Sequence, residues 1–222
     1  MIGLGELAGR PGSQPDPALA PAEAYLQRLA RGVAATMRLP DEMRIQVHLA
    51  DVALPNAFAT LGGHVIVTRG LYDRMPSENA LAMVLAHEIG HVRARDPIAA
   101  LGGNASLALL LALMGGDVET LAPQIAGLVQ RGYSREAERE ADAAALGALE
   151  RFYGHAGGAA AVFRQLATAA GPAAARTPGL LATHPTDAAR IARLEAAATD
   201  WDPAVQPLRP LAVTLPKSQS AR

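Results

Sequence analysis

Residues 77–95 constrain the fold most, because they predict a helix that must be buried although it carries ionisable side chains. Ser77 is a plausible N-cap residue with Glu78 in the first turn, and Pro97 stops the helix. Residues three and four positions apart share one face of a helix. The residues on that face are Ala80, Met83, Val84, His87 and His91. The two histidines are therefore expected to point toward the core.

The spacing of His87 and His91 predicts a metal site. Histidines at positions i and i+4 of a helix can both reach one ion at about 2.0–2.1 Å. Glu88 lies one residue round the helix, where it can take a proton from an attacking water without coordinating the ion. The alternative is an ordinary helix that carries two surface histidines.

A third metal ligand is expected in the acidic run at residues 134–142. Zinc at a catalytic site usually takes three protein ligands and leaves one position for water. Glu138 and Asp142 lie at positions i and i+4 and so share one helix face. One of these carboxylates can bind the ion while the other orients a histidine. Considered alone, this run would equally fit a solvated charged helix.

The pattern along the rest of the chain predicts a mainly helical α+β fold. Apolar and polar residues alternate over 45–50, which is typical of a half-buried strand. Residues 57–60 and 64–68 flank a Leu61-Gly62-Gly63 turn and predict a hairpin. We therefore expect a small antiparallel sheet packed by the helix at 77–95. Further helices are expected at residues 17–37, 98–114, 118–131, 134–153, 156–170 and 185–198.

The length of 222 residues fits one domain. Residues 1–16 are punctuated by glycine and proline and are expected to form a flexible N-terminal tail. Residues 17–200 are expected to form the domain, and residues 201–222 a proline-rich C-terminal tail.

Composition excludes several classes of function. The chain has no cysteine, so disulfides, thiolate metal sites and cysteine nucleophiles are ruled out. Its net charge of −1 leaves no basic excess to neutralise phosphates, and we expect no nucleic-acid partner. Residues 1–21 lack the apolar core of a signal peptide. The protein is therefore expected in the cell envelope or periplasm if an export signal has been removed, and in the cytoplasm otherwise.

No charged residue occurs between Asp96 and Asp117, but glycines and polar residues interrupt this stretch. A spanning helix needs about 20 predominantly apolar residues. A buried helix is therefore the first interpretation of the stretch. Alternatively, residues 98–116 form a surface that contacts a membrane or a client protein, or a true span.

Four sequence blocks carry a family resemblance. They are Asn56-Ala57-Phe58-Ala59 through Gly62-Gly63 to Thr68-Arg69-Gly70-Leu71; His87-Glu88-Ile89-Gly90-His91; Ser134-Arg135 with Glu138 and Ala141-Asp142; and His184-Pro185 with Arg190-Ile191. In this order they resemble the gluzincin zinc metalloproteases of the HtpX and CAAX-protease type, including the BepA-like branch. The resemblance covers residues 20–198. The chain differs from the HtpX branch in lacking clear transmembrane hairpins.

The resemblance implies a zincin-like metalloprotease domain and a role for each matching residue. His87, His91 and Glu138 would bind Zn²⁺, Glu88 would be the general base, and Asp142 would orient a ligand. The implied activity is that of a zinc metalloendopeptidase that cleaves unfolded or extended protein segments, with a role in protein quality control.

The resemblance also implies where a substrate binds. Asn56, Ala57 and Phe58, with the strand at 64–68, would form the edge of the active site, where a protein or peptide substrate lies as an added strand. An exposed strand edge offers backbone partners to any extended peptide. Considered alone, Asn56 would equally fit a turn residue after Pro55.

His184 has three possible roles. As a catalytic residue it could stabilise the oxyanion that forms during hydrolysis. It could instead bind zinc as a fourth ligand and close the site, or it could cap the helix that follows. The second role connects to an alternative function, a non-catalytic or latent chaperone-like binding protein with a closed zinc site that holds clients through residues 98–116.

Overall fold

The computed structural model describes residues 17–97, 133–170, 180, 184 and 186–216. Both expected helices between 98 and 131 lie outside these residues, as does the surface proposed at 98–116. The described elements are α2 (Ala20–Ala35), β1 (Gln46–Ala50), β2 (Ala57–Ala59), the short 3-10 helix η1 (Leu61–Gly63), β3 (His64–Thr68), α3 (Arg69–Tyr72), α4 (Glu78–Ala94), α7 (Arg135–Tyr153), α8 (Ala161–Ala170) and α10 (Ala188–Ala196). Within this described part, no helix is long and apolar enough to cross a membrane.

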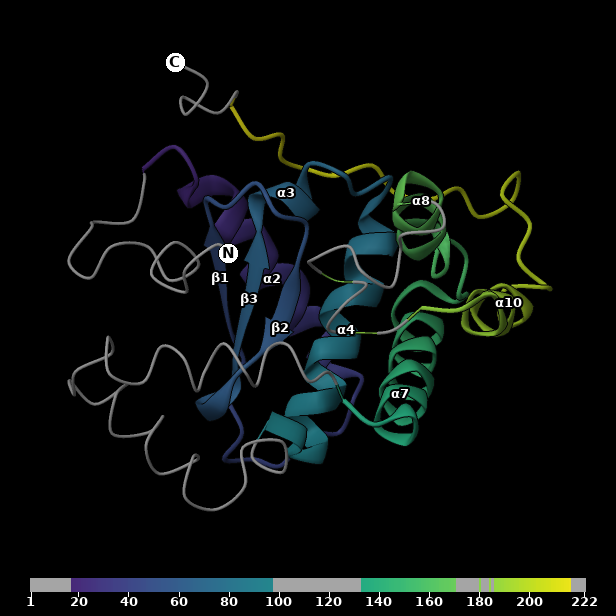
Figure 1. Ribbon diagram of the computed structural model, residues 1–222, viewed down its shortest axis with the longest axis horizontal. Coiled ribbons are helices and arrows are strands. Elements are labelled where there is room, and N and C mark those ends of the chain that lie inside the picture. The colour runs from purple at the N-terminus through teal and green to yellow at the C-terminus, as the bar shows by residue number, and fades with distance from the viewer. Residues whose placement is uncertain (1–16, 98–132, 171–179, 181–183, 185, 217–222) are drawn as a thin grey trace.

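The sheet is mixed, so the prediction of an antiparallel sheet was wrong in part. The strand order is β1-β3-β2 (Figure 1). β2 and β3 form the expected antiparallel hairpin, with Phe58 opposite Ile66. β1 instead runs parallel to β3, because the chain leaves β1 at Ala50, beside Thr68, and crosses the end of β3 before it enters β2. The alternating pattern predicts that a segment is a strand but carries no information about its direction.

The hydroxyl group of Thr68 holds this crossing in place. Its oxygen accepts hydrogen bonds from the backbone N–H of Asn56 at 2.8 Å and of Leu71 at 3.3 Å. The Thr68 hydroxyl also lies 2.6 Å from the carbonyl oxygen of Leu54, to which it can donate. Gly70 lies where the crossing is tightest, since a Cβ atom there would meet the carbonyl oxygen of Ala53 at 2.0 Å.

Side chains of α2 bind the outer edge of β1. Gln27 accepts a hydrogen bond from the N–H of Val47 at 2.8 Å and donates one to the carbonyl of Ile45 at 3.0 Å. Glu23 accepts one from the N–H of Leu49 at 3.0 Å. Backbone groups that would otherwise be open to another strand are thus satisfied from within the domain.

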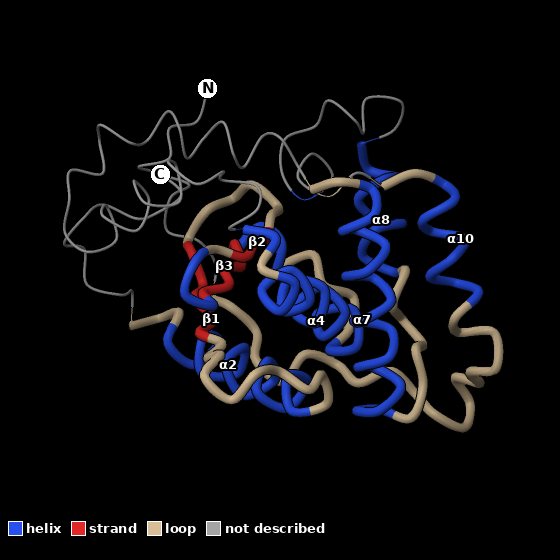
Figure 2. The backbone as a smooth tube through the Cα atoms, turned by 90° about the horizontal axis from the view of Figure 1, so that it is seen from below, coloured by secondary structure: helices blue, strands red, loops and turns tan. Residues whose placement is uncertain are grey.

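α4 is the central helix and lies between the sheet and α7 (Figures 1 and 2). As predicted, Ser77 caps it, accepting a hydrogen bond from the N–H of Ala80 at 3.1 Å. Every residue from Asn79 to Val92 is buried. A helix surrounded by protein presents even its polar side chains to the interior, and His87, Glu88 and His91 are accordingly buried.

Small residues allow α4 and α7 to approach closely. A Cβ atom on Gly90 would lie 3.2 Å from the Cα atom of Ala141. Ala145 and Ala148 continue the buried face of α7 toward its C-terminal end. The closest approach therefore falls beside Glu138 and Asp142, and it brings the acidic face of α7 to the histidines of α4.

The last two described helices begin later than predicted. α8 begins at Ala161, because Gly158 adopts a positive φ of 85° that a helix does not accommodate. α10 begins at Ala188, because Asp187 adopts an extended conformation and its side chain accepts from the N–H of Arg190 at 2.7 Å. His184 is therefore not the cap of this helix, and that interpretation was wrong.

The segment after α10 lies against α3 and the start of α4. The carbonyl of Val213 accepts a hydrogen bond from the Tyr72 hydroxyl at 2.6 Å. The carbonyl of Arg209 accepts one from the N–H of Glu78 at 2.8 Å. The described part of the predicted proline-rich tail, up to residue 216, thus contacts the domain.

Candidate metal centre

Three separate parts of the chain meet in one buried cluster. α4 supplies His87 and His91, α7 supplies Glu138, and His184 lies between α8 and α10 in the sequence. One potential ligand atom from each of these residues lies within 4.8 Å of all the others. Each of the four side chains is buried. The predicted ligands His87, His91 and Glu138 are therefore brought together, and His184 joins them although 97 positions separate it from His87.

The two histidines of α4 direct the same ring atom toward the cluster centre. Their Nε2 atoms lie 3.0 Å apart. The carboxylate of Glu138 lies opposite, with Oε1 3.4 Å from His91 Nε2 and Oε2 3.5 Å from His87 Nε2. Two imidazoles and one carboxylate that converge in this way form a typical donor set for zinc.

Acidic residues behind the histidines orient their rings. Asp142 Oδ1 lies 3.0 Å from Nδ1 of His87, which fits the predicted orienting role. Asp96 Oδ2 lies 2.8 Å from Nδ1 of His91. A carboxylate at Nδ1 favours the tautomer that leaves Nε2 free for a metal. Sequence reasoning missed Asp96, and its only signal was a carboxylate five residues after His91.

Glu88 faces His184. Its Oε1 atom lies 3.2 Å from Nε2 of His184, and both side chains are fully buried. Burial raises the pKa of Glu88, but the positive charge of His184 outweighs this effect and brings the pKa to about 2. Conversely, burial lowers the pKa of His184, but the charges of Glu88 and Glu138 raise it to about 10. In the metal-free protein these two residues form an ion pair.

The pKa values of His87 and Glu138 are shifted in the same directions as those of His184 and Glu88, up for the histidine and down for the carboxylate. Burial lowers the pKa of His87, but the contacts with Asp142 and Glu138 dominate and raise it. Burial raises the pKa of Glu138, whereas His184, His87 and His91 together hold it far below its ordinary range. The carboxylate of Glu138 is therefore ionised, and the raised pKa values of His87 and His184 favour their protonated forms beside it.

His184 belongs to the cluster. Its Nδ1 atom lies 2.8 Å from Oε1 of Glu138 and 3.1 Å from Nε2 of His87. Its backbone N–H donates to the carbonyl of Leu180 at 2.8 Å, and the N–H of Leu180 donates to the carbonyl of Pro55 at 2.8 Å. These two backbone hydrogen bonds link His184 of the cluster to the loop that precedes β2.

The residues present fit a divalent cation. The Oε2 atom of Glu138 and the Nε2 atom of His184 are buried and lack a partner in hydrogen-bond geometry, as do both carboxylate oxygens of the neighbouring Glu88. Buried polar atoms without such partners are costly unless something else satisfies them. A cation among these donors satisfies them and balances the excess of carboxylates.

Arg190 and Tyr133 also contribute to the cluster. The Tyr133 ring stacks on the ring of His91 at a centroid distance of 3.9 Å. Arg190 is buried and donates to both oxygens of Asp142, at 2.9 and 2.7 Å. The sequence pattern marked Arg190 only as part of the late block, and it did not indicate Tyr133.

The predicted substrate residues lie on the opposite edge of the sheet from β1. Asn56 and Ala57 are buried and Phe58 is half-buried. β2 is an edge strand, but β3 lies between β1 and β2. The prediction that the strand at 64–68 forms part of the active-site edge was therefore wrong, since β3 pairs on both sides.

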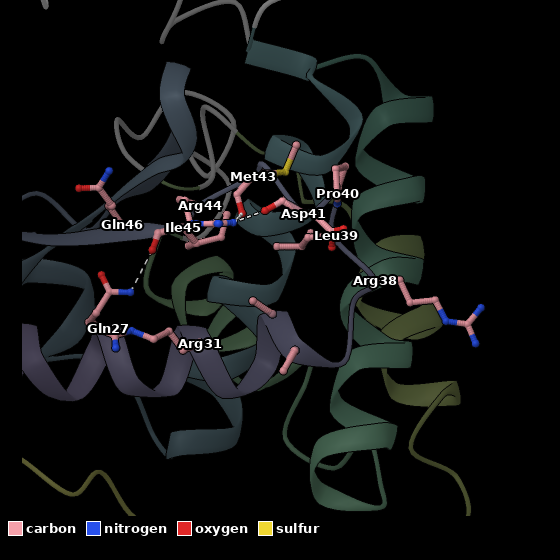
Figure 3. Close-up of a pocket in the computed structure, with 12 residues that line it drawn as sticks. Gln27, Arg31, Arg38, Leu39, Pro40, Asp41, Met43, Arg44, Ile45 and Gln46 are labelled. Carbon is pink, nitrogen blue, oxygen red and sulfur yellow. Dashed lines mark hydrogen bonds between the residues drawn. The ribbon is translucent and has the colours of Figure 1, made fainter.

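One surface pocket among the described residues lies away from this cluster. It has a volume of about 870 Å³ and lies between the second half of α2 and the chain that leads into β1 (Figure 3). Its lining includes Arg31, Asp41 and Arg44, and the Arg38 side chain extends away from it. None of the predicted site residues lines it.

Comparisons with known proteins agree with this site. The model of peptidase family M48 matches residues 20–198. A putative beta-barrel assembly-enhancing protease of Vibrio cholerae is 33% identical over 67% of this chain and 33% of that protein. The mitochondrial metalloendopeptidase OMA1 of Schizosaccharomyces pombe is 25% identical over 86% of this chain and 56% of its own length. The protease HtpX of Legionella pneumophila is 34% identical over 44% of each chain.

The matched region thus covers only between a third and somewhat over half of these relatives. Within this chain it extends from the first turn of α2 to just after α10, and it includes every residue of the buried cluster. The chain belongs to peptidase family M48.

Proposed function

We propose that this chain is a zinc-dependent endopeptidase that cleaves unfolded or extended protein segments. The observation that carries the proposal is the convergence of His87, His91 and Glu138 in one buried cluster, with Glu88 beside them. A purely structural metal site has no use for a further buried carboxylate. Membership of a peptidase family supports the same conclusion.

His87, His91 and Glu138 would hold the zinc ion, with Asp142 and Asp96 behind the two histidines. When bound, zinc polarises the carbonyl of the scissile peptide bond and makes water a stronger nucleophile. The absence of cysteine leaves the oxygen and nitrogen donors of this cluster as the ligands available.

Glu88 would act as the general base. Its low pKa keeps the carboxylate ionised at neutral pH, so it can accept a proton from the attacking water. The same carboxyl group then gives the proton to the leaving amine nitrogen, which restores the starting state. Proton transfer of this kind contributes about 10²–10⁴-fold to rates.

The substrate would bind along β2. Asn56 and Thr60 form backbone hydrogen bonds with Thr68 and His64, so alternate residues of β2 face β3. Ala57 and Ala59 lie between them and direct their backbone N–H and C=O groups to the outer edge. An extended peptide would pair with these groups with little demand on its sequence, which suits unfolded protein as substrate.

The alternative is a latent or chaperone-like protein with a closed zinc site. Its support is the position of His184, whose Nδ1 lies 2.8 Å from Glu138 Oε1. A fourth protein ligand would leave no position for water. In the open form the same residue, next to Glu88, would serve as the donor that stabilises the oxyanion.

A role in protein quality control is part of the proposal. Its support is the names of relatives, which include a beta-barrel assembly-enhancing protease of Escherichia coli at 29% identity over 38% of that protein. A location in the cell envelope or periplasm stays a prediction, as does client contact through residues 98–116.

The deciding experiment compares wild type, Glu88→Gln and His184→Ala at equal zinc content on an unfolded protein such as casein. Cleavage by wild type that is lost in Glu88→Gln supports the endopeptidase. Cleavage only by His184→Ala supports the latent form. If none of the three cleaves although all bind zinc, the binding-protein interpretation replaces the enzyme.

A further inference from the structure

Arg190 is a buried cation that joins the acidic residues of the cluster. Its side chain is 3% exposed. Nε and Nη2 donate to the two oxygens of Asp142, and Nη1 lies 2.9 Å from Oε2 of Glu138. Glu138 and Asp142 are like charges at positions i and i+4 of α7, which repel each other. One guanidinium group therefore offsets the negative charge of both carboxylates.

The guanidinium group is also fixed from other directions. Nη1 donates to the backbone carbonyl of His184 at 3.3 Å. The ring of Phe163 on α8 packs on the guanidinium group at 4.6 Å from its centroid. A planar group held at its edges and on a face has little freedom to rotate, so it transmits a defined geometry to its partners.

We propose that Arg190 is a positioning residue that controls how Glu138 and His87 present their ligand atoms to the metal. Both oxygens of Glu138 face the histidines, but only Oε2 lies beside Arg190, at 2.9 Å from Nη1, and this ion pair would weaken Oε2 as a ligand relative to Oε1. It holds His87 mainly through Asp142, because the carboxylate that it clamps lies at Nδ1 of His87, and Nη2 of Arg190 itself lies 3.5 Å from that Nδ1. A single-oxygen contact from Glu138 preserves a coordination position for water. The inference rests on the proposed zinc function.

The test separates the charge of Arg190 from its shape. Arg190→Lys keeps the positive charge but loses the planar fork that grips two carboxylates. We expect this variant to fold yet to bind Zn²⁺ about 10–100-fold more weakly, as measured by competition with a chelator. The matched control is Arg164→Gln, which removes an exposed ion pair between α8 and Glu195 of α10 and should leave the affinity unchanged.

A spectroscopic readout reports the geometry directly. The parent protein for all measurements is Glu88→Gln, so that cleavage does not interfere. Loaded with Co²⁺, the Arg190→Lys protein should show weaker visible absorption, because a second oxygen of Glu138 raises the coordination number. A change of affinity without a change of spectrum would contradict a positioning role, as would an unchanged affinity.

Two further variants keep the test decisive. Phe163→Leu loosens the support of the guanidinium group without altering any charge and should shift the Co²⁺ spectrum in the same direction, even if Arg190→Lys fails to fold. The double variant Asp142→Asn/Arg190→Lys should lose less Zn²⁺ affinity than the sum of the losses in the two single variants, since both residues act through His87. If the Glu88→Gln parent itself binds no zinc, the proposed function fails, and this outcome is distinct from failure of the Arg190 inference.

Discussion

Ala141 on α7 lies so close to Gly90 on α4 that a Cβ atom on Gly90 would come within 3.2 Å of the Ala141 Cα atom. Gly90 comes one residue before His91 on α4. It faces the part of α7 that carries Glu138 and Asp142. The distance between the two helices at this point sets the distance between imidazole and carboxylate.

Gly90→Val should therefore disturb both stability and metal binding. The added side chain must push α7 away, and overpacking of this kind costs about 1–3 kcal/mol of unfolding free energy. Urea unfolding and zinc affinity measure the two effects. The control is Gly147→Ala on α7, where a Cβ atom meets only the flexible end of Arg151. That change should stabilise the helix by about 0.5–1 kcal/mol, and equal losses in both variants would contradict the close-contact explanation.

The metal-free protein should lose stability at both ends of the pH range. The pKa of His184 is raised to about 10 in the folded state, so its contribution is complete below its ordinary value near 6.5 and is lost as pH rises toward 10. The pKa of Glu88 is lowered to about 2, so its contribution is present above about 4.5 and is lost as pH falls toward 2. Melting temperatures in the presence of a chelator measure both limbs.

His184→Gln should remove most of the alkaline loss, because it deletes the group whose pKa is raised. The acidic limb should become shallower in the same variant, since Glu88 loses the cation that lowers its pKa. An alkaline limb that persists unchanged in His184→Gln would show that other groups cause it.

Zinc should stabilise the folded chain and release protons when it binds. A ligand at 100 times its dissociation constant adds about 2.7 kcal/mol to the unfolding free energy. The raised pKa of His87 means that its proton must leave before it can bind a metal. Calorimetry in two buffers of different ionisation enthalpy measures the proton release. In Glu138→Gln the stabilisation by zinc should largely disappear, and full stabilisation there would move the third ligand elsewhere.

Thr68→Val should destabilise the sheet although it preserves the side-chain shape. The change leaves the N–H groups of Asn56 and Leu71 without their acceptor, at a cost of about 1–3 kcal/mol. Thr199→Val is the control, because its hydroxyl is exposed and bonds only within its own turn. Chemical denaturation of the two variants should therefore differ clearly, and similar midpoints would contradict the role given to Thr68.

The sequence predicted those features of the fold and the site that follow from the spacing of residues within one helix. Helical spacing located α4 and its Ser77 cap, and it placed His87 and His91 on a buried face, because the period of a helix is visible within a few turns. The i and i+4 spacing of Glu138 and Asp142 likewise predicted that both face the same neighbour. Both carboxylates do lie at the histidines of α4.

What depends on tertiary contacts could not be predicted in this way. The parallel pairing of β1 with β3 follows from the crossing held by Thr68, which no alternation of apolar residues reveals. Arg190 reaches Asp142 across 48 positions of sequence, and an arginine on a short helix cannot be told from a solvated residue until the fold buries it. For a related reason α10 begins later than predicted, since the extended conformation of Asp187 decides where the helix begins.

The contacts that Glu23 and Gln27 make with β1 have a consequence for how the sheet meets other chains. A sheet with two open edges can take up a strand on either side and can propagate from one molecule to the next. Because α2 satisfies the outward N–H groups of Val47 and Leu49, addition on that side is blocked by the domain itself. Strand addition is then restricted to the β2 edge, the strand that packs most closely on α4.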